Sequence, residues 1–491
     1  MSLLSARTLV FGSSAVILVL EILAGRLMAP YVGVSLETFT GIIGVFLAGI
    51  ALGAWGGGVL ADRTDPARLL GPLLLASGVA TLLGPPIVDA LGAAVRTGGP
   101  VEIVALTAAG FLVPTVALAA VTPLVIKLRL RSLAETGSVV GSFSAVGTLG
   151  SLVGTFATGF VLLAAFPSRP LVAAVGVALG LVGVVALVHR GRLAAAGLGV
   201  AFALAAAATL AVAGGPCDVE TTYYCASVEI DPTRPGGRVL WLDALRHSYV
   251  DLDDPTHLEF RYTQVMADVV AAIPPGPLDV AYIGGGGFTL PRHTGAVRPG
   301  STATVLEIDG DLVTLAEDRL GLVARHDLTV VVGDARLALP TLPPGGFGAV
   351  VGDAFGGLSV PWHLTTVEFL EQVAGLLDVG GVYVVNVIDH PPLDFARAAT
   401  ATLAAVFSDV AVIAPPDVVA GTVGGNVVLV AVVHGEVDRA GITAAIGERG
   451  GVEVVTDPAA TYRFIGGARV LVDDFAPVDQ LLSPRPRRVA P

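Results

Sequence analysis

Seven long apolar stretches fill the first 213 residues of this chain and constrain its fold more than any other feature. They cover residues 7–29, 38–60, 69–91, 101–126, 138–166, 169–188 and 193–213. A helix needs about 20 mostly apolar residues to cross the hydrocarbon core of a bilayer. The sequence therefore predicts a multi-pass α-helical membrane domain of about seven spans over residues 1–213, located in the cell membrane.

Glycine is concentrated in the second and fifth of these stretches. The residues are Gly41, Gly44, Gly49, Gly53 and Gly56 in the second, and Gly141, Gly147, Gly150 and Gly154 in the fifth. Small residues let helix backbones approach one another closely in lipid, so we expect close helix–helix contacts along both stretches.

The charge of the chain changes sign near residue 214. Residues 1–213 contain 11 Lys and Arg against 7 Asp and Glu, whereas residues 214–491 contain 17 against 34. An acidic globular half argues against a nucleic-acid partner, which would need a basic face, and suits a cationic ligand better. Lys127 is the only lysine, which excludes a P-loop. Cys217 and Cys225 are too few for a CxxC-type zinc site, and no metal-ligand spacing is present.

The loops between the apolar stretches differ in positive charge. On the side of the N-terminus lie Arg7, Arg63, Arg68, Lys127, Arg129, Arg131, Arg190 and Arg192, and on the other side lie Arg96 and Arg169. The positive-inside rule then places the N-terminus in the cytoplasm. Seven spans would put the acidic half outside the cell, where Cys217 and Cys225 could form a disulfide. An error of one span reverses that conclusion, and the long 138–166 stretch is where such an error is expected.

The acidic half divides into three regions. Residues 214–277 contain short strand patterns around a Pro-Gly-Gly turn and predict a small β-subdomain with a connecting helix. Residues 278–435 alternate apolar runs with helical stretches, which predicts a doubly wound, mostly parallel α/β sheet of the Rossmann type. The runs are Val280–Ile283, Ala303–Ile308, Leu328–Val332, Ala349–Val351, Val382–Val387, Val410–Ile413 and Val427–Val432. Residues 436–491 form a C-terminal extension, whose arginine- and proline-rich end is expected to be disordered.

Glycine and acidic residues follow the first four runs of the predicted sheet, at the edge where such sheets bind ligands. Gly284–Gly287 come after the first run, Glu307 lies at the end of the second, Asp334-Ala335 come after the third and Asp353 after the fourth. Each acid alone could cap a helix, but the three acids together with the glycine turn favour a nucleoside-type ligand.

With this order of motifs, the acidic half resembles the polyamine aminopropyltransferases, the spermidine synthase family, which share the class I methyltransferase fold. Gly237–Asp243 resembles the family's G-R-x-L-x-L-D strand, and Gly284–His293 aligns with its GGGDGGxxRE motif. The whole chain resembles the membrane-spanning fusion form of that family.

The resemblance implies roles for individual residues. Gly284, Gly285 and Gly286 would contact the nucleoside. Glu307 would contact its ribose, and Asp334 and Ala335 would contact its adenine. Asp353 would accept the proton of the attacking amine, on a loop that ends at Pro361 beside the nucleoside. Tyr224 falls on a nucleoside-contacting glutamine, and His257 falls on the middle residue of a substrate-side Tyr-His-Glu triplet when residues are counted from Asp243 without gaps.

Two departures from the family pattern concern amine recognition. Gly287 stands where the family has the aspartate that contacts the aminopropyl amine of the donor, and His293 replaces a glutamate. Both changes remove carboxylates, so they affect the choice of donor and acceptor and leave the nucleoside pocket intact.

The resemblance implies aminopropyl transfer from decarboxylated S-adenosylmethionine, a co-substrate, to putrescine or a related amine, which gives spermidine and methylthioadenosine. It implies no permanently bound cofactor and suggests a homodimer. An S-adenosylmethionine-dependent methyltransferase and a nonenzymatic polyamine sensor or transporter remain alternatives. The loop charges favour an external globular half, whereas the chemistry favours a cytoplasmic one because the donor is made there.

Overall fold

The computed structural model describes residues 1–95, 99–130, 132–188, 202, 215–323, 325–357 and 359–482. The chain divides into two compact units. The helical unit comprises Met1–Ser227 and Leu242–Leu245, and the globular unit comprises Val228–Trp241 and Arg246–Pro491. The first residues of the predicted β-subdomain therefore pack with the helical unit.

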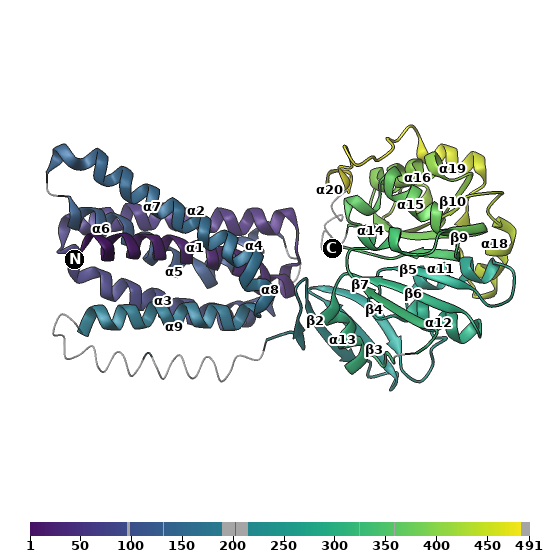
Figure 1. Ribbon diagram of the computed structural model, residues 1–491, viewed down its shortest axis with the longest axis horizontal. Helices are drawn as coiled ribbons and strands as arrows, with labels where there is room; N and C mark the ends of the chain where they lie inside the picture. Colours follow the sequence, from purple (N-terminus) through teal and green to yellow (C-terminus); the bar gives the residue numbers. More distant parts are fainter. Residues whose placement is uncertain are drawn as a thin grey trace. The chain divides into compact units, whose positions relative to one another are not determined.

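Long apolar helices build the helical unit (Figure 1). They are α1 (Leu3–Val32), α2 (Leu36–Arg63), α3 (Pro66–Gly92), α4 (Pro100–Thr107), η1 (Ala108–Leu112), α5 (Val113–Ala119), α6 (Val121–Arg129), η2 (Leu133–Glu135), α7 (Thr136–Ala157), η3 (Thr158–Leu162), α8 (Leu163–Ala165) and α9 (Ser168–Val188). Within the described residues, six stretches are long and apolar enough to span a membrane. They match the first six predicted stretches, including 138–166 as a single span, and the seventh, 193–213, lies outside the described residues.

The fourth span, Pro100–Arg129, is not a uniform α-helix. It contains the π-helical turn η1, which ends two residues before Pro114. Proline has no N–H, and its ring clashes with the carbonyl four residues earlier, which here belongs to Gly110 inside η1. The wider turn relieves this clash, so the break is a local consequence of the sequence.

The predicted glycine contacts are present along part of each stretch. A Cβ atom at Gly150 or Gly154 of α7 would collide with the carbonyl oxygens of Phe11 and Ala15 in α1, whereas one at Gly141 would meet nothing within 4 Å. In α2, the helix backbone likewise approaches α4, α5 and the residues between α5 and α6. Its glycines with such contacts are Gly41, Gly49, Gly53 and Gly57, whereas Gly44 and Gly56 have none.

A polar cluster joins residues 215–227 to one end of the helices. The guanidinium of Arg26 donates to the carbonyl oxygens of Thr221 and Tyr223 at 2.5 and 2.6 Å. Glu220 accepts a hydrogen bond from the N–H of Ser168 at the start of α9. Next to these residues, Arg169 forms a bidentate ion pair with Asp89, to which Tyr31 also donates.

A four-stranded sheet of order β1-β2-β3-β4 confirms the predicted strand patterns between residues 219 and 251. The strands are β1 (Val219–Glu220), β2 (Cys225–Ile230), β3 (Gly237–Leu242) and β4 (Leu245–Asp251). Cys217 and Cys225 form a disulfide beside the antiparallel pair β1–β2.

An eight-stranded mixed sheet of order β12-β10-β11-β9-β8-β5-β6-β7 forms the centre of the globular unit. The strands are β5 (Asp279–Ile283), β6 (Thr302–Glu307), β7 (Leu328–Val332), β8 (Phe347–Gly352), β9 (Leu377–Asp389), β10 (Asp409–Ala414), β11 (Gly425–Val432) and β12 (Val454–Val455). Strands β5 to β9 pair in parallel, and β11 is antiparallel to β9 and β10. This is the predicted Rossmann-type, methyltransferase-like fold, with all seven predicted runs as strands.

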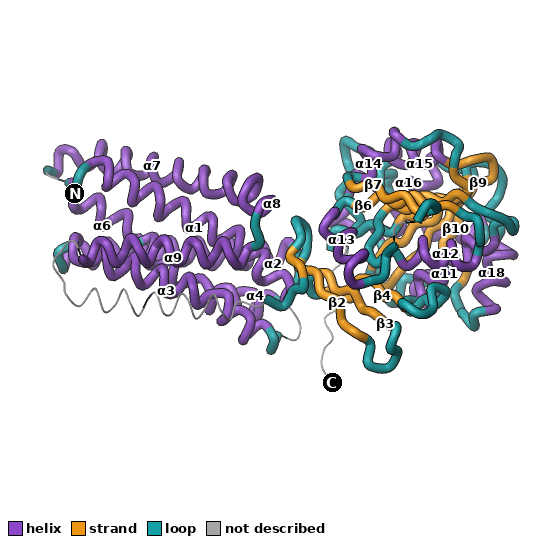
Figure 2. Tube along the Cα trace, turned by 60° about the horizontal axis from the view of Figure 1, so that its bottom comes forward, coloured by secondary structure: helices purple, strands orange, loops and turns teal. Residues whose placement is uncertain are grey.

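Helices cover both faces of this sheet (Figure 2). On one face, α11 (Arg261–Ala272) contacts α12 (Thr289–Val297) and α18 (Arg439–Glu448), and on the other, α15 (Val367–Leu376) and α19 (Pro458–Ile465) contact α16 (Asp394–Val406). The remaining helices are α13 (Gly310–Arg319), α14 (Ala335–Ala338), η4 (Leu339–Thr341), η5 (Trp362–Leu364), α17 (Pro416–Val419) and α20 (Val478–Leu481).

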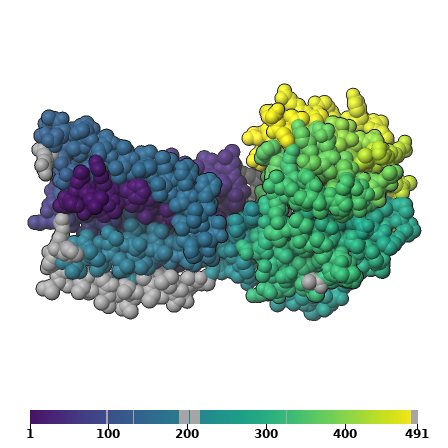
Figure 3. All heavy atoms as spheres, in the orientation of Figure 1, coloured from purple at the N-terminus to yellow at the C-terminus, as the bar shows by residue number. Residues whose placement is uncertain are grey.

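The predicted C-terminal extension, residues 436–491, is part of the globular unit where it is described. Its strand β12 pairs with β10, and its residues, yellow in Figure 3, form a continuous part of the unit's surface. The end that was expected to be disordered, Pro484–Pro491, lies outside the described residues.

The close contact between α1 and α7 predicts opposite effects for two alanine substitutions. Gly150→Ala should destabilise the protein by roughly 1–3 kcal/mol, because the new methyl group collides with the backbone of Phe11. Gly141→Ala, in the same helix, should be neutral or stabilising, because alanine is the better helix former and the site is open. Thermal unfolding in detergent checks this difference, and equal melting temperatures would contradict the packing of α1 on α7.

Candidate functional site

The glycine turn, Gly284–Gly287, connects β5 to α12 at the carboxyl edge of the large sheet. Gly284 and Gly286 have φ angles of +94° and +50°, which favour glycine. A Cβ atom at Gly284 would lie 2.6 Å from the carbonyl oxygen of Asp353. Glycine at this position therefore allows the end of the neighbouring strand β8 to approach the turn.

Glu307, at the end of β6, holds the glycine turn from behind. Its carboxylate accepts hydrogen bonds from the N–H groups of Gly285 at 2.7 Å, Gly286 at 3.2 Å and Asp309 at 2.9 Å. Burial raises the pKa of Glu307, and the three N–H donors oppose that rise because they favour the ionised form. The glycine turn and Glu307 thus form one hydrogen-bonded unit.

Asp334 and Ala335 lie at the next strand end, after β7. Asp334 caps α14 by accepting a hydrogen bond from the N–H of Arg336 at 2.8 Å, and its second oxygen lies 3.1 Å from Nε2 of His363. His363 belongs to η5, which begins directly after Pro361. The loop that ends at Pro361 is therefore connected to the Asp334 strand end through this contact.

Asp353 follows β8 and is held by two side chains from other elements. Tyr262 of α11 donates its hydroxyl to Oδ2 at 3.1 Å, and Asn386 of β9 donates its amide to Oδ1 at 3.1 Å. Burial raises the pKa of Asp353 to about 6, although both hydrogen bonds lower it. A carboxylate with a raised pKa is a better proton acceptor than an ordinary aspartate.

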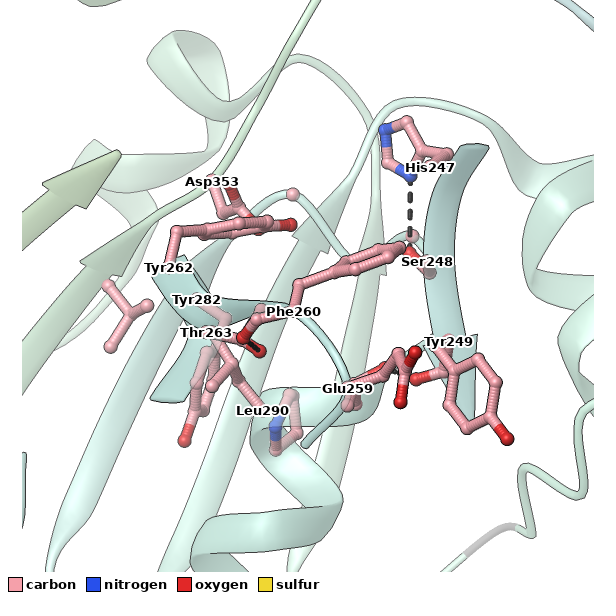
Figure 4. A pocket seen from close by; sticks show the side chains of 16 residues that line it. His247, Ser248, Tyr249, Glu259, Phe260, Tyr262, Thr263, Tyr282, Leu290 and Asp353 are labelled. Carbon is pink, nitrogen blue, oxygen red and sulfur yellow. Dashed lines mark hydrogen bonds between the residues drawn. The ribbon is translucent and has the colours of Figure 1, made fainter. Parts of the chain in front are cut away.

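A cavity of about 510 Å³, including its open mouth, lies between α11, β4 and the glycine turn (Figure 4). Its lining residues are His247, Ser248, Tyr249, Glu259, Phe260, Tyr262, Thr263, Tyr282, Gly284, Gly285, Gly286, Thr289, Leu290, Pro291, Val351 and Asp353. Four predicted site residues, Gly284, Gly285, Gly286 and Asp353, are thus brought together at one cavity.

Other predicted site residues do not line this cavity. Glu307 ends β6, Asp334 and Ala335 follow β7, and Pro361 follows β8. Gly287 contacts β4. Tyr224 lies in the helical unit, where its carbonyl accepts a hydrogen bond from the N–H of Thr221. The roles assigned to these residues stay predictions.

His257, predicted to contact the substrate, also lies outside the cavity lining. Its Nε2 is 3.3 Å from a carboxylate oxygen of Glu259, and its ring meets the ring of Tyr249 edge-on at 5.5 Å. The gapless count from Asp243 missed the residues that do line the cavity, Tyr262 and Thr263. Tyr262-Thr263-Gln264 is itself a tyrosine-led triplet with a glutamine at its end, and that signal was available in the sequence.

The charges near the cavity mouth are largely paired. Glu259 lies 3.4 Å from Arg246 and 3.3 Å from His257. The Arg246 guanidinium also lies over the rings of Phe260 and Tyr249, at 4.9 and 5.6 Å from their centres. Among the described residues, no group of three or more His, Cys, Asp or Glu side chains is placed to hold a metal ion.

Comparisons with known proteins find curated relatives of one kind. The chain is 33% identical over 114 residues to a polyamine aminopropyltransferase of Vibrio vulnificus, and 31% identical over 288 residues to one of Mycobacterium tuberculosis. These alignments cover 23% and 52% of this chain and 38% and 53% of the relatives. The chain thus spans about half, or less, of the length of the curated relatives it matches. No family model matches it.

Solved structures that the chain matches include a probable spermidine synthase of Corynebacterium glutamicum. It is 28% identical, with a TM-score of 0.49, and the match covers 53% of this chain and 97% of that one. The spermidine synthase of Thermotoga maritima is 19% identical, with a TM-score of 0.34, over 53% of this chain and 81% of that one.

The raised pKa of Asp353 predicts a pH-dependent cost to stability. Ionisation of this buried carboxyl destabilises the folded state as the pH rises from about 4 through about 6, so Asp353→Asn should stabilise the protein more at pH 7.5 than at pH 4.5. Melting temperatures at the two pH values measure this difference. Asp318→Asn, on the exposed face of α13, is the control. A stabilisation that does not change with pH would contradict a buried, titrating Asp353.

Proposed function

We propose that the globular half of this chain is a polyamine aminopropyltransferase, and that it transfers an aminopropyl group from decarboxylated S-adenosylmethionine to putrescine or a related amine. The products would be spermidine, or its counterpart, and methylthioadenosine. The observation that carries the proposal is the position of Asp353, a carboxylate with a raised pKa on the cavity wall beside the glycine turn.

The reaction needs a proton acceptor more than any other group. The amine nitrogen forms a bond to the carbon attached to the sulfonium, the C–S bond breaks, and its electron pair stays on the sulfur of methylthioadenosine. Amines are mostly protonated at neutral pH, so a carboxylate must take the proton before or during the attack. Asp353 fits this role, because Tyr262 and Asn386 fix both of its oxygens on the cavity wall.

The nucleoside would lie across the neighbouring strand ends. Glu307 would accept a hydrogen bond from a ribose hydroxyl at the acceptor site that its three N–H partners leave, because a carboxylate has about four such sites. Asp334 and Ala335 would contact the adenine, with the loop ending at Pro361 beside it. Positioning of donor and acceptor would supply most of the remaining rate enhancement.

The amine would enter the cavity beside Tyr262 and Thr263, which we propose as substrate-side residues in place of His257. The aromatic rings of Phe260, Tyr262 and Tyr282 suit the methylene chain of an aliphatic amine. The helical unit would anchor the protein in the membrane. A homodimer remains a prediction from the family resemblance.

Product analysis tests this proposal directly. Purified full-length protein, incubated with putrescine and decarboxylated S-adenosylmethionine, should form spermidine and methylthioadenosine, detected by mass spectrometry. Asp353→Asn should lower kcat by about 10²–10⁴-fold and leave methylthioadenosine binding unchanged, because only the proton acceptor is lost. Formation of S-adenosylhomocysteine from intact S-adenosylmethionine would instead indicate methyl transfer. Equal loss of nucleoside binding in the variant would make Asp353 structural.

Two observations favour a second candidate, an extracytoplasmic polyamine-binding protein. Cys217 and Cys225 form a disulfide, and disulfides are typical of oxidising compartments. Residues 215–227 contact the helix end that carries Arg26 and Arg169, whereas the opposite end carries Arg7, Arg63, Arg68, Lys127 and Arg129. The positive-inside rule places the more basic end in the cytoplasm, so it places residues 215–227 outside.

Thiol counting and a reporter fusion separate the two candidates. The chain has two cysteines, so the disulfide predicts that iodoacetamide modifies no residue until a reductant is added. A reporter fused after Pro491 that is active outside the cytoplasm would support the binding protein. Two free thiols together with a cytoplasmic reporter signal would exclude that candidate and support the enzyme.

A further inference from the structure

The end of the cavity at the glycine turn is closed by strand β4. A Cβ atom at Gly286 would lie 2.9 Å from Oγ of Ser248 and 3.1 Å from Cε1 of His247, so both side chains lie directly against the turn. Gly287 donates its N–H to Oγ of Ser248 at 3.1 Å, and Nδ1 of His247 lies 3.2 Å from the same oxygen. Figure 4 shows this pair on the cavity wall, apart from Asp353 and Tyr262.

The packing leaves no room for an acidic side chain at position 287. A Cβ atom there would lie 2.9 Å from Cβ of Ser248 and 3.0 Å from Cγ2 of Val250. Both neighbours are short side chains on a sheet strand, which cannot move aside without shifting β4. Gly287 is therefore required by the contact between the turn and β4.

The side chains of His247 and Ser248, which contact the turn at Gly286, are polar and uncharged, whereas Asp353 lies at the Gly284 side of the same turn. Burial lowers the pKa of His247 to about 4, so its imidazole is neutral at physiological pH. The carboxylates that line the cavity are Glu259, which is paired with Arg246 and His257, and Asp353, which Tyr262 and Asn386 hold. Glu307 lies behind the turn with its oxygens directed to backbone N–H groups.

A neutral histidine–serine pair can bind groups of either charge. A neutral imidazole has one donor and one acceptor nitrogen, and a hydroxyl group can donate and accept. Such a pair can accept from an ammonium and donate to a carboxylate, whereas an acidic side chain could only accept and would repel a carboxylate.

We propose that His247 and Ser248 contact the tail of the sulfonium donor and that this contact does not select the decarboxylated form. The site would bind the zwitterionic amino-acid tail of intact S-adenosylmethionine about as tightly as the cationic aminopropyl tail. Intact S-adenosylmethionine is then a competing ligand of the same site. This inference rests on the proposed function only in that the donor is a nucleoside sulfonium.

Calorimetric titration of the full-length protein with each donor tests the inference without turnover. The dissociation constants of intact and decarboxylated S-adenosylmethionine should agree within about tenfold. A preference of 100-fold or more for the decarboxylated form would overturn the inference and leave the proposed function standing. Similar dissociation constants for the two donors, without formation of any amine product, would support the inference and overturn the proposed function. Absence of binding by both donors and by methylthioadenosine would overturn both.

Two variants at one position sharpen this test. Ser248→Asp introduces a carboxylate beside the proposed position of the donor tail. It should weaken the binding of intact S-adenosylmethionine by about tenfold or more relative to the binding of the decarboxylated form. Ser248→Ala removes the hydroxyl without adding charge and should change that ratio by less than about threefold. Unchanged binding of methylthioadenosine, which has neither an amine nor a carboxylate, shows that the variants are folded. An unchanged ratio in Ser248→Asp would place the donor tail elsewhere.

Discussion

The parallel pairing of β5 with β8 is the constraint on which the rest of the site depends. Ile283 lies opposite Gly352, so the two strands end together, and the glycine turn begins where Asp353 leaves the sheet. Gly284 lets the two backbones approach, and the N–H of Asp353 donates to the carbonyl of Ile283. This pairing fixes the carboxylate of Asp353 relative to the turn before any ligand is present. Preorganisation of this kind is what a displacement reaction needs, because its catalysis depends mainly on position and proton transfer.

Around this pairing, the polar groups of the cavity fall into two sets with different electrostatics. Asp353 has a carboxylate that Tyr262 and Asn386 fix in place, and its ionisation is costly because the group is buried. At the glycine turn, His247 is neutral, because its burial disfavours the charged form. The same physical cause, loss of hydration, therefore raises the pKa of the acid and lowers that of the imidazole. The result is a proton-accepting carboxylate beside Gly284 and a polar pair without net charge beside Gly286, on either side of the same turn.

The helices of the helical unit are held together differently, because lipid supplies no hydrophobic force between helices. Close backbone approach replaces it, as at Gly150 and Gly154 against α1. At one end of these helices, the guanidinium of Arg26 donates hydrogen bonds to the carbonyl oxygens of Thr221 and Tyr223. These two residues lie between Cys217 and Cys225, which form the disulfide. These contacts hold the start of the small sheet to the helices, so the first strand residues belong to the helical unit and not to the globular one.

The sequence by itself determined the features that depend on nearest neighbours along the chain. Span length, strand runs, the glycine turn and the acids after β6, β7 and β8 could all be predicted, because hydrophobic period and strand ends are local properties. Only the tertiary structure decided which side chains meet at the cavity. Tyr262 of α11 and His247 of β4 line the cavity, and Asn386 of β9 holds Asp353, so three separate elements surround the end of β8. His257, which a gapless count from Asp243 selected, lies outside the lining of that cavity, and its substrate role stays a prediction. The contacts across the sheet edge, not the distance along the chain, determine which residues face a substrate.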